Sequence, residues 1–167
     1  MPSDVDRLAG LITDGRRIMV VTGAGISTGS GIPDFRGPNG VWKTQRPVMY
    51  QDFVRSPEQR VRYWEQKAGA AEVFDAARPG AVHEACVRLE EAGVLGAIVT
   101  QNVDGLHQDA GSSADRVVEV HGTGREAKCL GCGDRTRIGP HLEEFGRTGE
   151  PPVCAECGGL LKPATIS

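Results

Sequence analysis

Four cysteines near the carboxyl end of the sequence carry its clearest chemical signal. They form two Cys-x-x-Cys pairs separated by 21 residues: Cys129, Cys132, Cys154 and Cys157. A glycine follows each pair, at Gly133 and Gly158, as expected for tight turns. Four thiolates complete a tetrahedral zinc site and leave no position for water, so the spacing predicts a structural zinc ion. A redox or disulfide role is the alternative.

A glycine-rich segment early in the chain is a second candidate site. The stretch "VVTGAGISTGSGIPDFRG" (residues 20–37) places Gly23, Gly25 and Gly29 directly behind an apolar run. Such glycines let backbone N–H groups approach a phosphate, which favours a dinucleotide. Because Thr28 stands at the third position of the usual GxGxxG fingerprint, an ordinary dehydrogenase is disfavoured. A glycine-rich turn that binds no ligand is the alternative interpretation of this segment.

The end of the glycine segment favours a ligand. Asp34, Phe35 and Arg36 place an aromatic ring between two charges, in a loop where nothing structural demands them. An aromatic ring beside charged groups suits a sugar and phosphates.

His121 stands out among the four histidines because it follows an apolar segment and precedes Gly122. A histidine at that position is suited to general-base chemistry near neutral pH, and a capping or zinc-linked role is the alternative. We expect His83 and His107 to make local hydrogen bonds and assign them no chemistry. The same holds for His141, within the cysteine-rich segment.

Helix and strand signals alternate along the chain and must position these residues. A capping box at Ser3 and Asp6 with a stop at Gly15 predicts a first helix. Ser56 and Pro57 begin a second helix, and residues 79–93 form a third, in which Cys86 is expected to pack in the core. Strands are predicted at 17–22, 96–102 and 116–122. The first lacks polar alternation, as in a strand buried on both faces.

This order indicates an α/β fold with a doubly wound, Rossmann-like parallel sheet whose ligand crevice lies at the carboxyl ends of the strands. The candidate segments all follow strands, so we expect them to converge there. From Arg125 the composition changes to cysteine, glycine and proline, which predicts an inserted zinc-ribbon module. The predicted division is a Rossmann-like domain at 1–124, the zinc module at 125–162, and a return to the Rossmann-like domain at 163–167.

Composition narrows the functional classes. The 167 residues are 39% hydrophobic and 25% charged, which is ordinary for one globular domain. Without a signal-peptide pattern or a membrane-spanning apolar run, we expect a cytoplasmic protein without membrane contact. A net charge of −3 argues against direct nucleic-acid binding. A zinc-ribbon module that binds nucleic acid is a weaker alternative, because six basic and six acidic residues cancel between 125 and 162.

Taken together, the motifs resemble one family. "GAGISTGSGIPDFRG", "TQNVDGLHQDAG", "VEVHG" and the paired cysteines, in this order, are similar to the sirtuins, NAD-dependent protein lysine deacylases. The resemblance runs from about Ile18 to the end of the chain. It implies NAD as co-substrate, a structural zinc ion, and an acyl-lysine protein or peptide as partner. The family's products are free lysine, nicotinamide and O-acyl-ADP-ribose.

The resemblance also implies roles for the glycine segment. The residues facing the NAD pyrophosphate and neighbouring ribose would be Gly23, Ala24, Gly25 and Ser27. A mobile loop over the nicotinamide side would be formed by Asp34, Phe35 and Arg36.

The remaining implied roles lie after the second and third strands. Gln101 and Asn102 would bind the nicotinamide ribose, and Asn102 would also position a water. Asp104 with Ile32 would hold the nicotinamide amide. His121 would be the general base that activates a ribose hydroxyl, so His121 and Asn102 are the predicted catalytic residues.

Acyl preference is predicted from the second helix. Family members that favour negatively charged acyl groups resemble one another in a Tyr-x-x-Arg pair there. Here Tyr63 is followed three places later by Gln66, which predicts acetyl or other uncharged acyl groups. Arg60 and Arg62 are the alternative source of a positive charge.

The motifs leave one alternative activity open. Some sirtuin-like proteins transfer ADP-ribose to protein, and the motifs do not separate that activity from deacylation.

Chains of related sirtuins continue beyond the zinc module, so these residues resemble the amino-terminal part of a sirtuin. We therefore expect the chain alone to bind NAD weakly, to show little activity, and to expose one edge or face of the strand at 17–22. The sequence makes no prediction of oligomeric state.

Overall fold

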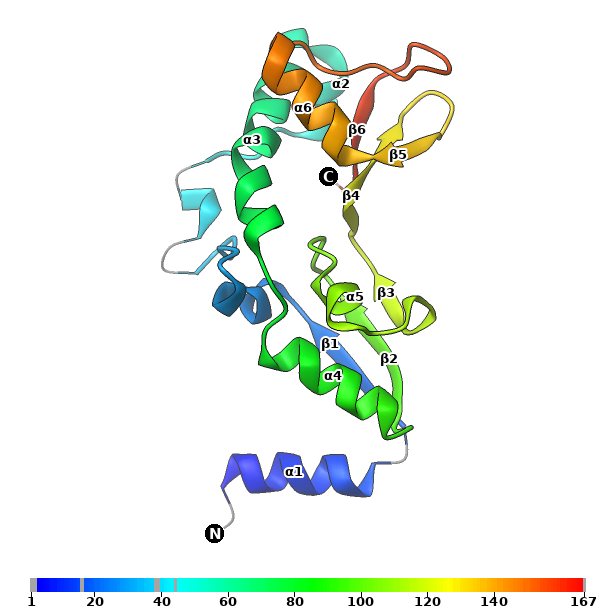
Figure 1. Cartoon of the computed structure of the whole chain (residues 1–167). Coiled ribbons are helices and arrows are strands. Elements are labelled where there is room, and N and C mark those ends of the chain that lie inside the picture. The colour runs from blue at the N-terminus through cyan, green and yellow to red at the C-terminus, as the bar shows by residue number, and fades with distance from the viewer. Residues whose placement is uncertain (1–2, 16, 38–39, 44, 167) are drawn as a thin grey trace.

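Figure 1 shows a computed structural model of the chain, which describes residues 3–15, 17–37, 40–43 and 45–166. Its lower half holds a parallel sheet in the order β1 (Ile18–Thr22), β2 (Leu95–Thr100) and β3 (Val117–Glu119). Thr22 pairs with Thr100, which pairs with Glu119, so the carboxyl ends of the three strands lie side by side. The predicted α/β class and parallel sheet are confirmed.

Helix α4 (Ala81–Glu91) covers one face of this sheet (Figure 1). Cys86 is buried there against Leu95 and Ile98 of β2. Burial raises the pKa of the Cys86 thiol, in keeping with a packing role. Just past the end of α4, Gly93 has φ +72°, the left-handed conformation that glycine tolerates best. The predicted third helix and its stop are confirmed.

The opposite face of the sheet is open in the described structure. Met19 and Val21 of β1 are 66% and 64% exposed, and Val118 of β3 is 49% exposed. The prediction that this first strand is buried on both faces is therefore wrong for this chain, because α4 covers one face only. The expectation that it is exposed at an edge or face is confirmed, since β1 also forms the edge of the sheet.

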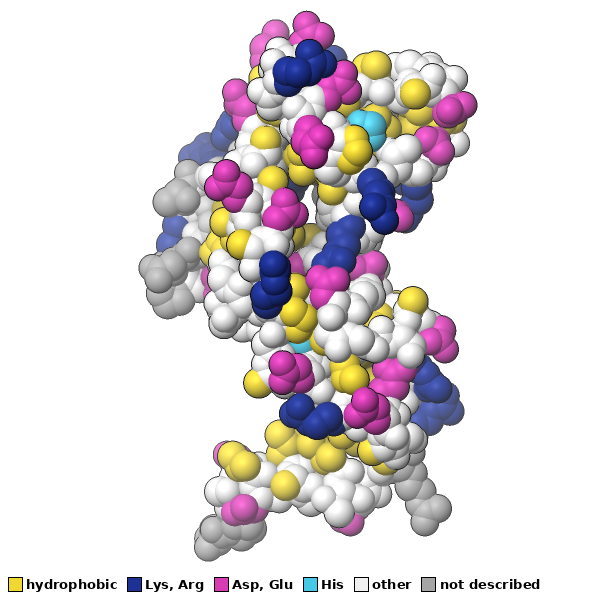
Figure 2. All heavy atoms as spheres, viewed as in Figure 1, with side chains coloured by type: hydrophobic (Ala, Val, Ile, Leu, Met, Phe, Trp, Pro, Cys, Tyr) yellow, Lys and Arg dark blue, Asp and Glu magenta, His cyan; other side chains and the backbone are white. Residues whose placement is uncertain are grey.

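Helix α1 (Asp4–Asp14) begins at the predicted capping box. The Ser3 hydroxyl accepts a hydrogen bond from the Asp6 backbone N–H (3.1 Å), and the Asp6 carboxylate accepts one from Ser3 N–H (2.9 Å). The helix lies below α4 in Figure 1, and hydrophobic side chains show on this lower end of the molecule in Figure 2. Its apolar stripe remains exposed: Val5, Leu8, Leu11 and Ile12.

The upper half of the molecule is built on a second sheet, antiparallel, in the order β5-β4-β6 (Figure 1). The strands are β4 (Gly122–Cys129), β5 (Arg135–Arg137) and β6 (Leu161–Thr165), with α6 (Ile138–Thr148) packed beside them. This sheet begins before residue 125 and extends past residue 162. Of the predicted segment 163–167, Ser167 lies outside the described residues.

Helices α2 (Tyr50–Arg55) and α3 (Pro57–Ala76) pack on this second sheet, although they lie far from it in sequence. Phe53 and Trp64 join Ala127, Phe145 and Leu161 in one buried cluster. The predicted start of α3 is confirmed, because Ser56 caps it by accepting a hydrogen bond from Gln59 N–H (3.2 Å). Among the described residues, no helix combines the length and apolar character needed to cross a bilayer.

The short connections complete the fold. Helix α5 (Leu106–Ala110) follows β2, and 3₁₀ helices cover Ala24–Ser30, Val41–Lys43 and Ala114–Arg116. The glycine segment thus enters a 3₁₀ helix after β1.

Candidate functional site

The carboxyl ends of β1 and β2 are joined through two buried threonines. The Thr22 hydroxyl donates to the Thr100 hydroxyl (2.9 Å), and the Gln101 backbone N–H donates to Thr22 O (3.0 Å). The Thr100 hydroxyl in turn accepts from the Asn102 backbone N–H (3.0 Å). These contacts bring the segment after β2 beside the glycine segment after β1, the convergence that the alternating order predicts.

The glycine segment leaves its backbone uncovered. A Cβ atom placed on Gly23, Gly25 or Gly29 would meet nothing within 4 Å, and none of these residues has a positive φ. Neither local conformation nor packing among the described residues therefore requires glycine at these positions. Open space against the backbone fits close approach by a phosphate-bearing ligand, so the segment suits a dinucleotide. Ala24 is half-buried within the 3₁₀ helix.

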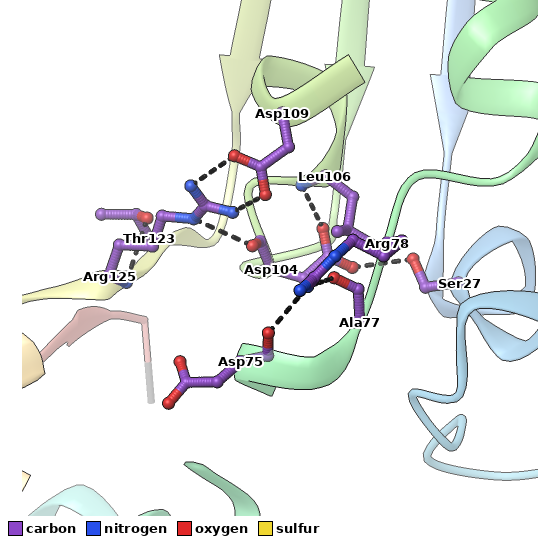
Figure 3. A network of polar contacts seen from close by, with 9 residues as sticks. All are labelled: Ser27, Asp75, Ala77, Arg78, Asp104, Leu106, Asp109, Thr123 and Arg125. Atoms are coloured by element: carbon purple, nitrogen blue, oxygen red, sulfur yellow. Dashed lines mark hydrogen bonds and ion pairs between the residues drawn. The ribbon is translucent and has the colours of Figure 1, made fainter. Parts of the chain in front are cut away.

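A buried polar cluster lies where the two segments meet. The Ser27 hydroxyl donates to Asp104 Oδ2 (2.7 Å) and accepts from Asn102 Nδ2 (3.1 Å). Asp104 Oδ1 accepts from the Leu106 backbone N–H at the start of α5 (3.0 Å). Figure 3 shows Asp104 between Ser27 and Leu106. Since all three polar side chains are at most 8% exposed, their orientation is fixed before any ligand binds.

Ile32 lies beside this cluster. Its side chain is buried with Ala77 and Leu106, and its backbone N–H donates to Ser27 O (3.2 Å). The structure thus places Ile32 near Asp104. The family resemblance assigns both residues to the nicotinamide amide.

The segment from Asp34 to Arg36 lies outside the buried cluster. Asp34 Oδ1 accepts from the Gly37 N–H (2.8 Å), and Asp34 O accepts from the Val41 N–H (2.9 Å), which forms a compact bend. Phe35 is 48% exposed at the tip of this bend, and Arg36 is exposed beside it. None of the hydrogen bonds described above joins Asp34, Phe35 or Arg36 to Asn102 or Asp104.

His121 sits between β3 and β4 with an exposed side chain. Its Nδ1 lies 3.0 Å from the backbone carbonyl oxygen of Gln101. A carbonyl oxygen only accepts, so Nδ1 carries the proton and Nε2 of the neutral ring is left as an acceptor. The Gln101 side chain is exposed, although its backbone N–H is bonded to Thr22 O, directly before the glycine segment. The neutral imidazole is thereby held at the strand ends with Nε2 as a hydrogen-bond acceptor.

Two other histidines form a buried pair beneath the strand ends. The rings of His83 and His107 are 4.8 Å apart, and His107 Nε2 lies 3.0 Å from Thr22 Oγ1. Burial, followed by the nearby His83, lowers the pKa of His107 to about 4, and burial also lowers the pKa of His83. His83 Nδ1 accepts from Gly80 N–H (3.1 Å). The expected local hydrogen bond is confirmed for His83, whereas His107 contacts Thr22, 85 positions away in the sequence. Neither that contact nor the pairing of the two rings has a signal in the sequence.

The four cysteines meet at the far end of β4. Their Sγ atoms all lie within 4.8 Å of one another, with Cys129 and Cys157 at 3.5 Å and Cys132 and Cys154 at 3.7 Å. Zn–S bonds of about 2.3 Å in a tetrahedron place sulfur atoms about 3.8 Å apart, so the geometry fits zinc. The four sulfurs would fill the coordination shell, as in a structural site.

The turns around the cysteines explain the geometry. Gly133 and Gly158 have φ of +82° and +68°, which confirms their predicted role as tight-turn residues. Gly131 N–H donates to Cys129 Sγ (3.3 Å), the type of contact that stabilises a thiolate. His141 is part of this module and lies 2.7 Å from Thr136 Oγ1 through Nε2. His121 lies just before the start of β4, whereas the cysteines lie at and beyond the other end of this strand.

Comparison with known proteins gives a consistent match. A model described as the Sir2 family matches residues 23–166. The chain is 42% identical over 165 residues to NAD-dependent protein deacetylase 1 of Bradyrhizobium diazoefficiens, an alignment that covers 99% of this chain and 65% of the relative. It is 41% identical over 167 residues to an NAD-dependent protein deacetylase of Rhodopseudomonas palustris, covering 100% of this chain and 66% of the relative. The chain thus spans just under two thirds of these relatives.

Solved structures agree. A structure from work on the mechanism and regulation of Sir2 enzymes superposes with a TM-score of 0.81 at 36% identity, covering 99% of this chain and 65% of that chain. A Sir2 complex with a deacetylated p53 peptide and 3'-O-acetyl ADP-ribose gives 0.83 at 33% identity, covering 98% and 65%.

Proposed function

Because this chain belongs to the Sir2 family, we propose that the protein uses NAD to remove acetyl or other uncharged acyl groups from protein lysine side chains. The observation that carries the proposal is the convergence of the Ser27–Asn102–Asp104 cluster with His121 at the strand ends. The products are deacylated lysine, nicotinamide and O-acyl-ADP-ribose.

The chain's own residues divide the recognition of NAD between them. The uncovered backbone at Gly23 and Gly25, with Ala24 between them, takes the pyrophosphate, and Ser27 takes the neighbouring ribose. Asp34, Phe35 and Arg36 cover the nicotinamide side, where the Phe35 ring excludes water. NAD supplies the chemistry, an electrophilic ribose carbon whose bond to nicotinamide breaks.

The segments after β2 and β3 orient the reacting end. Gln101 and Asn102 hold the nicotinamide ribose, and Asp104 with Ile32 holds the carboxamide. Asn102 is suited to this role because Ser27 and the Thr100 hydroxyl fix its side chain and backbone respectively. His121 takes a proton from a ribose hydroxyl at Nε2, while Gln101 O retains the proton on Nδ1. Asn102 and His121 are therefore the proposed catalytic residues.

Support for an uncharged acyl group comes from the basic side chains near Tyr63. Gln66 Nε2 donates to Arg46 O (3.1 Å), and Arg60 donates to the carbonyl oxygens of Phe53 and Val54. Arg62 reaches Arg46 O at 3.4 Å. The alternative arginines are thus engaged by backbone carbonyl oxygens.

The proposed partner is an acyl-lysine protein or peptide, without direct nucleic-acid contact. On the face seen in Figure 2, basic and acidic side chains are interspersed rather than gathered by sign. We also propose the cytoplasm as the location, because the zinc thiolates must stay reduced to bind metal.

The test is a deacetylation assay on an acetyl-lysine peptide, with and without NAD, for the parent and His121→Ala. It is run on the 167-residue chain and on a version extended to the length of the Bradyrhizobium relative. We expect NAD-dependent turnover in the longer version that His121→Ala abolishes, and weak NAD binding by the shorter chain, one sheet face of which is exposed. NAD-independent turnover, or full activity of His121→Ala, would reject the proposal.

A further inference from the structure

The start of β4 lies along the segment that follows β2 and is fastened to it at three successive points. His121 Nδ1 lies 3.0 Å from Gln101 O, and the Gly124 N–H donates to Val103 O (2.8 Å). The third point is a side chain, because Arg125 Nε donates to Asp104 O (3.0 Å). The segment that carries the base and the segment that carries Asp104 are therefore held as one unit.

The guanidinium of Arg125 reaches beyond this carbonyl to α5. Its Nη1 donates to Asp109 Oδ1 (2.7 Å), and its Nη2 pairs with Asp109 Oδ2. Figure 3 shows the guanidinium between Asp104 and Asp109. The planar fork thus makes a bidentate ion pair and a third hydrogen bond simultaneously, which a lysine ammonium does not reproduce. The hydrogen bond with Asp109 raises the pKa of Arg125, so its charge is retained.

Gly105 allows the guanidinium to lie this close. The residue has φ +72°, and a Cβ atom at this position would fall 2.6 Å from Arg125 Cζ. Glycine is therefore required both by the backbone conformation and by the packing of Arg125.

Asp104 is consequently held from two sides. Its backbone carbonyl is fixed by Arg125, and its carboxylate is fixed by Ser27 and the Leu106 N–H. Because the carbonyl group and the side chain of Asp104 are both bonded to its Cα atom, a shift of the carbonyl group also moves the carboxylate, which couples Arg125 to it.

We propose that Arg125 is a positioning residue that, with Asp109, sets the orientation of Asp104 and thereby the affinity for the nicotinamide end of NAD. The inference rests on the proposed function, since it assigns Asp104 to the nicotinamide carboxamide. Arg125 acts through Asp104 and does not itself contact the reacting atoms.

The Arg125–Asp109 pair has a matched control that involves the next residue of β4, Glu126. Arg135 Nη1 and Glu126 Oε2 are 2.8 Å apart, with side chains 51% and 41% exposed, against 48% and 39% for Arg125 and Asp109. Exposed ion pairs of this kind contribute little to stability. The two pairs differ in that only Arg125 contacts the segment carrying Asp104, so comparing them separates positioning from loss of an ion pair.

The experiment measures nicotinamide and NAD binding by calorimetric titration in the extended protein, for the parent, Arg125→Gln, Arg125→Lys, Asp109→Asn and the control Arg135→Gln. Hydrogen exchange of the Leu106 and Gly124 amides is followed in the same proteins. We expect Arg125→Gln to weaken nicotinamide binding about tenfold and to speed exchange of both amides. Arg125→Lys should not restore affinity, Asp109→Asn should give a smaller loss, and Arg135→Gln should match the parent. In turnover, KM for NAD should rise more than kcat falls.

The outcomes separate the two claims. A parent protein that binds neither nicotinamide nor NAD would overturn the proposed function and this inference with it. A parent that binds both, with equal affinity in folded Arg125→Gln and Asp109→Asn, would overturn the role of Arg125 alone.

Discussion

Nδ1 of His121 lies 3.0 Å from the backbone carbonyl oxygen of Gln101, so the proposed base is joined directly to the segment that bears the proposed ribose-binding residues. That contact fixes the tautomer that leaves Nε2 free of a proton. The proposed base is therefore oriented by a backbone carbonyl group.

His121→Ala removes this base. We expect kcat to fall about 10²- to 10⁴-fold, the usual contribution of a positioned general base, while NAD affinity changes far less. Single-turnover kinetics and calorimetric titration measure the two effects. His141→Ala is the control, because His141 lies in the zinc module. Equal losses in both variants would contradict the assignment.

The buried His107 predicts a dependence of stability on pH. Its pKa is lowered from 6.5 to about 4 in the folded protein, so the unfolded chain binds more protons between these values. The contribution of His107 to stability is therefore complete above about pH 6.5 and is lost as the pH falls toward 4. At pH 5 the loss is about 2 kcal/mol, since each pKa unit corresponds to about 1.4 kcal/mol.

Denaturant unfolding at pH 7 and pH 5 measures this effect. His107→Gln should be less stable than the parent at pH 7 but should lose less stability on acidification. His141→Gln should keep the parent's pH dependence. A parent and His107→Gln with identical pH dependence would show that His107 does not carry it.

The zinc site predicts coupled loss of metal and stability. Cys129→Ala or Cys154→Ala removes one of four ligands that lie within 4.8 Å of one another. Apparent zinc binding by small folding modules contributes about 10–16 kcal/mol, so chelation should loosen the β5-β4-β6 sheet. Metal content by atomic spectroscopy and near-ultraviolet circular dichroism follow the two effects. Stoichiometric zinc in either variant would refute this site.

Several helices, strands and the metal site can be predicted from the sequence because interactions between residues close together in the chain determine them. Apolar runs that end in threonine or glycine predict β1 and β2, and the capping residues Ser3 and Ser56 mark the starts of their helices. Cysteine spacing predicts the metal site because two short turns suffice to bring the thiolates together.

The remaining features depend on contacts between distant segments. Trp64 packs against Phe145 across 81 positions of sequence, so nothing local assigns α3 to the second sheet. Arg125 and Asp109 lie on different elements, and although Asp109 falls within the segment TQNVDGLHQDAG, nothing in the sequence pairs it with Arg125. The open face of β1 is likewise not visible in its composition, because Met19 and Val21 are apolar whether covered or exposed.

Acyl preference follows from the absence of a cation three residues after Tyr63. We expect acetyl-lysine peptide to be deacylated at least tenfold faster than the succinyl peptide of the same sequence, because Gln66 stands where an arginine would pair with the added carboxylate. Competition between the two peptides, followed by mass spectrometry, gives the ratio of kcat/KM directly. A succinyl preference would contradict this assignment while leaving NAD dependence intact.

The stoichiometry of products is the most direct test of NAD-dependent deacylation by this protein. The extended protein is incubated with NAD and an acetyl-lysine peptide, and free lysine peptide, nicotinamide and O-acetyl-ADP-ribose are quantified together by mass spectrometry. NAD-dependent deacylation predicts equal amounts of all three, each formed about 10²- to 10⁴-fold more slowly by His121→Ala. Nicotinamide release accompanied by ADP-ribose attached to protein, or free acetate formed without consumption of NAD, would contradict it.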